Sequence, residues 1–174
     1  MSQLWEAAEA SLQTEVSLEV LAEASSIADA ERARTRMIDT LSLTGARLSL
    51  ACQGGVTVIG HVVSSGSDLV LVEHERQQLT GIAVSSLIRV SGVDHRLPQE
   101  SPTAPLTWTR WLRSINNQKL GTVRIVTSDG WVTHGEIRYV GADFIRVAEN
   151  RGGETDVMIT SISAVTVSSV RLSE

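Results

Sequence analysis

An ungapped internal repeat constrains the fold of this chain more than any other feature. The segment GHVVSSGSDLV, residues 60–70, aligns with GEIRYVGADFI, residues 135–145, at a spacing of 75 residues. Apolar positions follow the same spacing, and the shared identities include Gly55 with Gly130, Gly60 with Gly135, Gly66 with Gly141, Asp68 with Asp143, Val72 with Val147, Ser86 with Ser161 and Val90 with Val165. Similarity that survives without gaps over a whole module indicates an internal duplication. Two copies are too few for a solenoid, which needs about three or more repeats to bury its faces.

Each copy has the period of β-strands, because apolar and polar residues alternate in short runs from residue 48 onward. The sequences QGG and SDG, residues 53–55 and 128–130, predict hairpin turns in which glycine takes positive φ. Gly60 and Gly135 lie inside strand patterns, where glycine permits a sharp bend or a bulge. Five short, bent strands in about 45 residues predict a small closed or nearly closed barrel in each copy.

Helical sequence precedes each copy. Residues 17–41 contain no Gly or Pro and are rich in Ala, Glu and Arg, which predicts a helix. Residues 108–117 predict a shorter helix with apolar residues at steps of three and four, namely Trp108, Trp111, Leu112 and Ile115. We expect these tryptophans to be packing anchors. All three prolines fall in residues 97–107, which predicts a linker.

The expected fold class is therefore α+β and mainly β: N-terminal helices followed by two tandem five-stranded small barrels, each preceded by a helix. Leu4 and Trp5 lie on the apolar side of a short amphipathic N-terminal helix, which we expect to pack on the protein itself or to bind a partner. The expected divisions are a helical segment at residues 1–41, a first barrel at 42–96, the linker at 97–107, and a helix with the second barrel at 108–174.

Composition limits the classes of function. The 174 residues are 42% hydrophobic, which is enough to fill a core, and the net charge of −5 gives no general attraction to phosphate backbones. A single cysteine, Cys52, excludes an internal disulfide, and the start MSQLWEAAEA lacks the pattern of a signal peptide, so we expect a cytoplasmic protein. No apolar run approaches the ~20 residues that span a bilayer, so we expect no membrane insertion.

The pattern VxIxxxDGxxxxGxI at residues 123–137, with an apolar strand around Phe144 and IxxIxxV at residues 159–165, resembles the Sm-like small barrels. That superfamily includes the RNA chaperone Hfq and the C-terminal domain of the ribosome-maturation factor RimP. The resemblance covers both copies and implies a helix followed by five bent strands. It also implies association through the exposed edges of the fourth and fifth strands.

The RNA site of Sm and Hfq rings is matched only in part. In those families an Asp followed by an Asn after the third strand, and an Arg-Gly or Lys-His element near the fourth, contact RNA. This chain keeps Asp68 and Asp143, but LVLVEH and FIRVAE follow without the Asn. Ser85-Ser86 and Thr160-Ser161 stand where the Arg-Gly would fall. The resemblance therefore does not carry the RNA site to this chain.

The whole chain also resembles an uncharacterised actinobacterial family, through the N-terminal LWEAAEASL, the Arg-rich ADAERARTRM, GSDLVLVE at residues 66–73 and VGADFIRVAE at residues 140–149. Members are sometimes labelled transcriptional regulators of the Fis type. A Fis-type DNA reader needs a helix-turn-helix with a basic recognition helix. Residues 17–41 contain no break for such a turn.

No pattern predicts catalysis, and we expect no catalytic residue, metal site or cofactor. The four histidines do not coincide at the 75-residue spacing, and none has metal-ligand spacing with another His, Cys or Asp. Cys52 alternates with apolar residues, which predicts a small buried side chain. The paired glycines lack the helix and lysine that follow them in phosphate loops. We therefore do not expect an enzyme.

The sequence thus predicts a non-enzymatic interaction or scaffold module that acts through self-association or a partner protein. Its candidate partner-binding residues are Leu4, Trp5, Trp131, Arg138, Tyr139 and Arg146. The alternative is a nucleic-acid-binding regulator, for RNA or DNA, that uses the Arg-rich helix and barrel loops. Its candidate contacts are Arg32, Arg34, Arg36 and Arg47. A third option is ligand sensing in the seam between the barrels.

Overall fold

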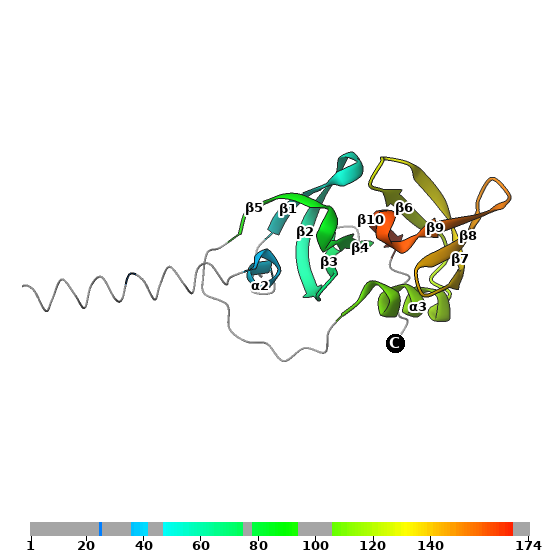
Figure 1. Cartoon of the computed structure of the whole chain (residues 1–174), viewed down its shortest axis with the longest axis horizontal. Helices are drawn as coiled ribbons and strands as arrows, with labels where there is room; N and C mark the ends of the chain where they lie inside the picture. The colour runs from blue at the N-terminus through cyan, green and yellow to red at the C-terminus, as the bar shows by residue number, and fades with distance from the viewer. Residues whose placement is uncertain (1–24, 26–35, 42–46, 75–77, 94–105, 169–174) are drawn as a thin grey trace, which may run out of the picture. The chain divides into compact units, whose positions relative to one another are not determined.

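The computed structural model of the chain describes residues 25, 36–41, 47–74, 78–93 and 106–168. The chain divides into two compact units, Met1–Arg36 and Met37–Glu174. All elements described below belong to the second unit (Figure 1). Most of the predicted N-terminal helix and most of the proline-containing linker lie outside the described residues.

The described part of the second unit is mostly β-structure, with two α-helices. Three short 3-10 turns, η1, η2 and η3, interrupt the strands. In chain order the elements are α2 (Met37–Leu41), β1 (Arg47–Cys52), η1 (Gln53–Gly55), β2 (Val56–Ser65), β3 (Leu69–Glu73), β4 (Gln78–Ala83), η2 (Val84–Ser86), β5 (Leu87–Ser91), α3 (Trp108–Gln118), β6 (Val123–Thr127), β7 (Val132–Val140), β8 (Phe144–Glu149), β9 (Glu154–Met158), η3 (Ile159–Ser161) and β10 (Ile162–Ser168).

All ten strands form one antiparallel sheet in the order β5-β1-β2-β3-β4-β10-β6-β7-β8-β9. The first half of the unit, residues 47–93, supplies β1–β5, and the second half, residues 106–168, supplies α3 and β6–β10. The two halves meet where β4 pairs with β10, with Gly81 opposite Val165. We call this pairing the internal junction.

The prediction of two tandem five-stranded barrels is wrong. The internal junction uses the backbone donors and acceptors along the outer side of β4, so the strands of the first half continue into those of the second and the sheet stays open. Alternation along a strand identifies its buried face, but it does not identify the strand that takes its hydrogen bonds. The sequence pattern therefore identifies the strands, but it does not show which strands pair with each other.

Local structure nevertheless recurs at the 75-residue spacing. The 3-10 turns η2 and η3 occupy aligned residues. Pairing of β2 with β3 shifts register across Val63, and pairing of β7 with β8 shifts across the aligned residue Arg138. The turn bond from Gly66 N–H to the Leu69 carbonyl, 2.7 Å, recurs from Gly141 to Phe144 at 2.8 Å. The two halves thus share their turns and bulges, although they lie in one sheet.

The predicted positive φ values are found in the turns, but the bulges predicted at Gly60 and Gly135 lie three residues later, at Val63 and Arg138. Gly54 and Gly130, in the QGG and SDG turns, have positive φ values of 78° and 90°. At Gly60 and Gly135 a Cβ would overlap a carbonyl oxygen of the neighbouring strand, that of Glu73 and of Ala148 respectively. Close approach of two backbones therefore requires glycine in β2 and β7.

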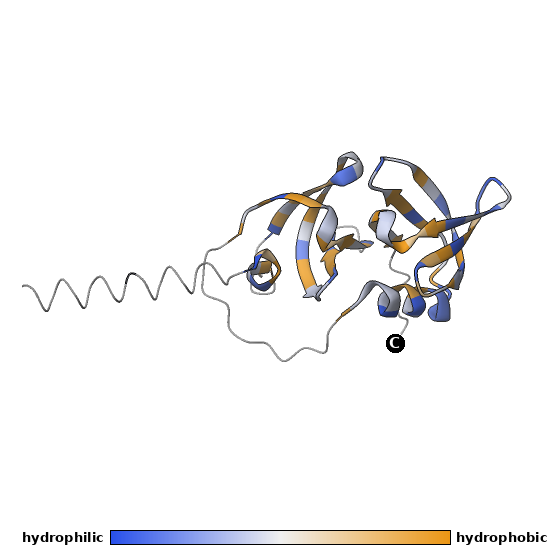
Figure 2. Ribbon diagram, viewed as in Figure 1, coloured by the Kyte–Doolittle hydropathy of each residue, from blue (hydrophilic) through white to orange (hydrophobic). Residues whose placement is uncertain are grey.

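Strand β3 is buried on both faces and separates two hydrophobic cores. Its residues Val70 and Val72 pack in the smaller core, together with Leu41, Leu48, Leu50, Cys52, Val58 and Ile82. Leu69 and Leu71, which point to the opposite face, pack in the larger core with α3 and the strands of the second half. Figure 2 shows the alternation of hydrophobic and hydrophilic residues along the strands that accompanies this burial.

Helix α3 is fixed at both ends and along its apolar face. Thr107 is the N-cap, and its hydroxyl accepts from the Arg110 N–H at 3.4 Å. The Asp68 carboxylate accepts from the Trp108 N–H at 3.2 Å, and Lys119 ends the helix with a φ of 49°. The four predicted apolar residues, Trp108, Trp111, Leu112 and Ile115, are all buried. The helix packs against β7 and contributes these residues to the larger core.

Trp111 also packs against the first half of the sheet and so links α3 to it. A Cβ on Gly81 of β4 would overlap the Trp111 ring, so only glycine leaves space for the indole. The ring therefore packs directly on β4, beside the internal junction.

Replacing Gly81 by alanine should weaken this contact. We expect Gly81→Ala to lower the free energy of unfolding by about 1–3 kcal/mol, the usual cost of overpacking. Arg113, on the same helix as Trp111, is exposed, so Arg113→Ala should change the unfolding midpoint little. Urea unfolding of the two variants and the parent checks this difference. Equal midpoints for Gly81→Ala and the parent would contradict the packing described.

Candidate functional site

Within the described residues the sheet has two free edges, β5 at one end of the strand order and β9 at the other. Among the described strands, β5 pairs only with β1 and β9 pairs only with β8. A free edge presents unpaired N–H and C=O groups that can pair with another strand. The two edges are therefore the first surfaces to consider for an interaction.

An ion pair lies on the sheet face beside β9. Arg146 donates from Nε and Nη2 to the two carboxylate oxygens of Asp156, each at 2.8 Å, and Glu154 lies 3.9 Å from Arg146 Nε. The hydrogen bond with Arg146 holds the pKa of Asp156 below its usual value, and the same bond raises the pKa of Arg146. Tyr139, on β7, is the register partner of Arg146, so the three side chains form a row across β7, β8 and β9.

Aromatic and sulfur-containing side chains lie next to this row. The Tyr139 and Phe144 rings are 5.7 Å apart between centroids and tilted by 41°. Phe144 is the register partner of Met158, which is 48% exposed on β9. We call Tyr139, Phe144, Arg146, Asp156 and Met158 the β9 face. Tyr, Phe, Met and Arg are the residues enriched at the centres of protein interfaces.

The structure brings together two of the predicted partner-binding residues, Tyr139 and Arg146. Arg138 occupies the bulge beside them and pairs with Glu136 at 3.1 Å. Trp131 precedes β7 at its opposite end, about 26 Å from Tyr139 along an extended strand. Leu4 and Trp5 lie outside the described residues.

The prediction missed Met158 and Ile88, the most exposed apolar side chains of the two edge strands. Ile88 is 69% exposed on β5, and its aligned residue, Ser163, is fully buried. Met158 aligns with Ala83, which is only 4% exposed. The repeat could have revealed both residues. At each of the two positions, the free edge carries a larger apolar residue than the aligned position at the internal junction.

The internal junction shows how such edges are covered. Ser86, in η2, donates to the Ala83 carbonyl at 2.8 Å and lies 3.2 Å from the Ser163 carbonyl of β10. The Thr80 and Thr166 hydroxyls are hydrogen bonded across the junction at 2.9 Å. The pairing thus combines the backbone ladder with hydroxyl contacts from both strands.

Matching groups stand at the free edges. Ser161, aligned with Ser86, donates to the Met158 carbonyl at 2.8 Å. Thr155, aligned with Thr80, donates to Glu149 at 2.6 Å, and Ser91 on β5 aligns with Thr166. Edge β9 carries the acidic residues Glu154 and Asp156, whereas edge β5 carries Arg89. The two free edges are therefore complementary in hydroxyls and apolar residues.

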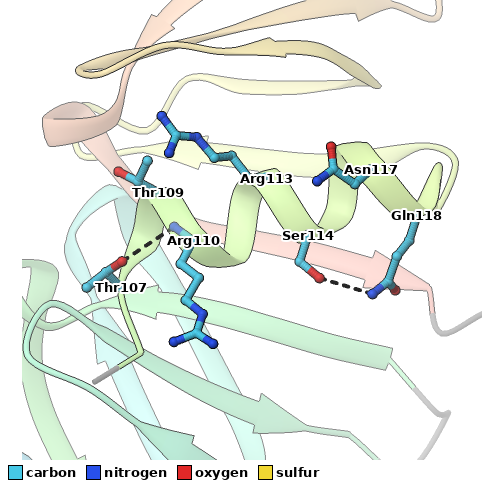
Figure 3. A pocket seen from close by; sticks show the side chains of 7 residues that line it. All are labelled: Thr107, Thr109, Arg110, Arg113, Ser114, Asn117 and Gln118. Carbon is cyan, nitrogen blue, oxygen red and sulfur yellow. Dashed lines mark hydrogen bonds between the residues drawn. The ribbon is translucent and has the colours of Figure 1, made fainter. Parts of the chain in front are cut away.

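Two of the four basic residues of the nucleic-acid alternative lie in the part of the chain that is described. Arg32 and Arg34 lie outside it, while Arg36 precedes α2 and Arg47 begins β1, both exposed. A shallow groove along α3 is lined by polar residues and two arginines (Figure 3). In Figure 3 the guanidinium groups of Arg110 and Arg113 point away from each other, so they do not converge on one ligand. Nucleic-acid binding stays a prediction.

Cys52 is buried, and burial raises the pKa of its thiol, against the smaller opposing effect of a hydrogen bond with Ser86. Within residues 36–41, 47–74, 78–93 and 106–168, no three His, Cys, Asp or Glu side chains are grouped so that they could hold a metal ion. Among the same residues, no helix is long and apolar enough to cross a membrane.

The ion pair of the β9 face can be checked by titration. In Arg146→Gln we expect the pKa of Asp156 to rise toward its ordinary value, because the paired hydrogen bonds are lost. A depressed carboxyl pKa stabilises the fold above the ordinary Asp pKa, and this contribution is lost as the pH falls through the folded value. Carboxyl carbon NMR against pH measures the shift. Arg138→Gln, which removes the neighbouring arginine paired with Glu136, should leave Asp156 unchanged; an unchanged Asp156 in Arg146→Gln would refute the pairing.

Comparisons of the chain with protein-family models, with curated proteins and with solved structures found no match. The resemblances to the Sm-like proteins and to the actinobacterial family therefore stay predictions.

Proposed function

We propose that this protein is a non-enzymatic interaction module that self-associates, with β9 of one copy pairing antiparallel with β5 of the next. The proposal includes the origin of the two halves in an internal duplication, so that the contact between copies repeats the internal junction. One observation supports it: Met158 and Ile88 are both exposed on the free edges, and the register of the internal junction, moved by the 75-residue spacing, would set them opposite each other.

The register of the proposed contact follows from the internal junction. There Ile82 is opposite Ala164, and Thr80 is opposite Thr166. Moving each strand by the 75-residue spacing sets Val157 opposite Arg89 and Thr155 opposite Ser91. The hydroxyl pair of the junction is thereby repeated between copies. Ser161 would gain the Ile88 carbonyl of the neighbouring copy as an acceptor, as Ser86 has that of Ser163.

Free energies indicate association of modest strength. Complete burial of a side chain such as Ile or Met contributes about 1.5–3 kcal/mol, and the strand ladder adds backbone hydrogen bonds. Association costs roughly 4–15 kcal/mol in lost translation and rotation. We therefore expect oligomers that depend on protein concentration. Since the two edges differ, the contact is head-to-tail and leads to rings or to open filaments.

Charged substitutions at the two edges test the proposal. The parent should increase in mass with concentration in light scattering coupled to size exclusion, whereas Met158→Asp and Ile88→Asp should each remain monomeric because a buried carboxylate opposes the contact. The matched control is Ile59→Asp, since Ile59 is 47% exposed on β2, away from both edges.

Mixing the two edge variants gives the sharpest result. Met158→Asp retains an intact β5 and Ile88→Asp retains an intact β9, so the mixture should form dimers that grow no further. A parent that stays monomeric at all concentrations, or edge variants that associate as the parent does, would overturn self-association through these strands. A mixture without dimers, beside a parent that associates, would exclude the head-to-tail arrangement.

A further inference from the structure

A polar cavity of about 450 Å³ lies at the internal junction, on one face of the sheet. Its polar lining includes His74, Thr80, Thr166, Arg124 and His134. Thr80 on β4 is the register partner of Thr166 on β10, Thr166 is that of Arg124 on β6, and Arg124 is that of His134 on β7. Four neighbouring strands thus place their polar side chains in one row along the cavity.

The described residues that line the cavity carry no negative charge, although the net charge of the chain is −5. None of these residues is Asp or Glu. Arg138 and Arg146 are paired with carboxylates, but no described carboxylate pairs with Arg124. An arginine with free guanidinium donors, beside two histidines and several hydroxyls, is the donor set that recognises carboxylate or phosphate oxygens.

A hydrogen-bonded chain leads from His74 into the cavity. His74 Nε2 lies 2.8 Å from the Thr80 hydroxyl, which lies 2.9 Å from the Thr166 hydroxyl. When His74 donates from Nε2, Thr80 accepts and can donate to Thr166. The Thr166 hydrogen is then available to a ligand. The chain can therefore orient a donor toward the same space as Arg124.

The fold does not require these basic residues. At the 75-residue spacing, Arg124 aligns with Ser49, His134 with Ile59 and His74 with Glu149. At each of these three positions, the half that lacks the basic residue forms the equivalent structure without it. Structural need therefore does not explain why three basic side chains meet at the internal junction.

We propose that this cavity binds a small organic or inorganic anion through a phosphate or carboxylate group. The Arg124 guanidinium makes the main contact, with Thr166 and His134 as further donors. The volume falls within the roughly 300–1,000 Å³ of small-molecule sites. The cavity lies at the internal junction and at neither free edge, so the proposal does not depend on self-association.

Titration with inorganic phosphate tests the site. The full chain is titrated at constant ionic strength set with sodium chloride, and the His74 and His134 ring resonances are followed by NMR. We expect saturable shifts in the parent, an affinity at least about tenfold lower in Arg124→Gln because charged hydrogen bonds are lost, and no change in Arg151→Gln. Arg151 is exposed in the turn between β8 and β9, outside the cavity.

Parallel titrations with acetate and citrate decide between a phosphate and a carboxylate ligand. Tighter binding of one anion class in the parent, with a similar loss of affinity in Arg124→Gln, supports the site and shows whether the ligand group is a phosphate or a carboxylate. Shifts that stay linear in every anion, or that saturate equally in the parent and in Arg124→Gln, overturn it. Arg124 is exposed, so its replacement leaves the fold intact, and the other amide resonances check this directly.

Discussion

The pairing of β4 with β10 is the interaction on which the rest of this structure depends. It joins strands from the two halves into one sheet, with the Thr80 and Thr166 hydroxyls bonded across it. Without it, both strands would expose a row of unpaired backbone groups. The open sheet, its two unequal edges and the polar cavity at the internal junction all follow from this one contact.

Packing on either side of the junction makes the two halves depend on each other. Strand β3 contributes Val70 and Val72 to the smaller core and Leu69 and Leu71 to the larger one. Helix α3, which precedes the second half, places Trp111 on Gly81 of the first. A change in either core is therefore felt on both faces of the central strands, because protein interiors are densely packed.

Much of the local structure could be predicted from the sequence. The QGG and SDG turns and the helix with Trp108 and Trp111 follow from short-range rules of backbone conformation and periodicity. Strand partners could not be predicted in this way. The run LVLV in β3 was a hint, since a continuous apolar run is typical of a strand buried on both faces.

The candidate site was predicted in part. Tyr139 and Arg146 differ from their aligned residues in an obvious manner, as exposed aromatic and charged side chains. Ile88 and Met158 look like ordinary strand residues, and their exposure becomes informative only beside the buried Ser163 and Ala83. Arg124, His74 and His134 are far apart in sequence and do not coincide in the repeat, so only the strand register brings them together.

The order of strands along the chain has a consequence for synthesis on the ribosome. β10 is the last of the described strands, and Thr166 follows its hydrogen-bond partner Thr80 by 86 residues. The edge of β4 that pairs with β10 therefore stays unpaired until β5–β9 have been translated. Contacts of such long sequence separation form slowly. Until they form, an unpaired strand edge can pair with an incorrect strand of the same chain or of another chain. A nascent chain of this protein is most exposed to misassembly immediately before β10 emerges.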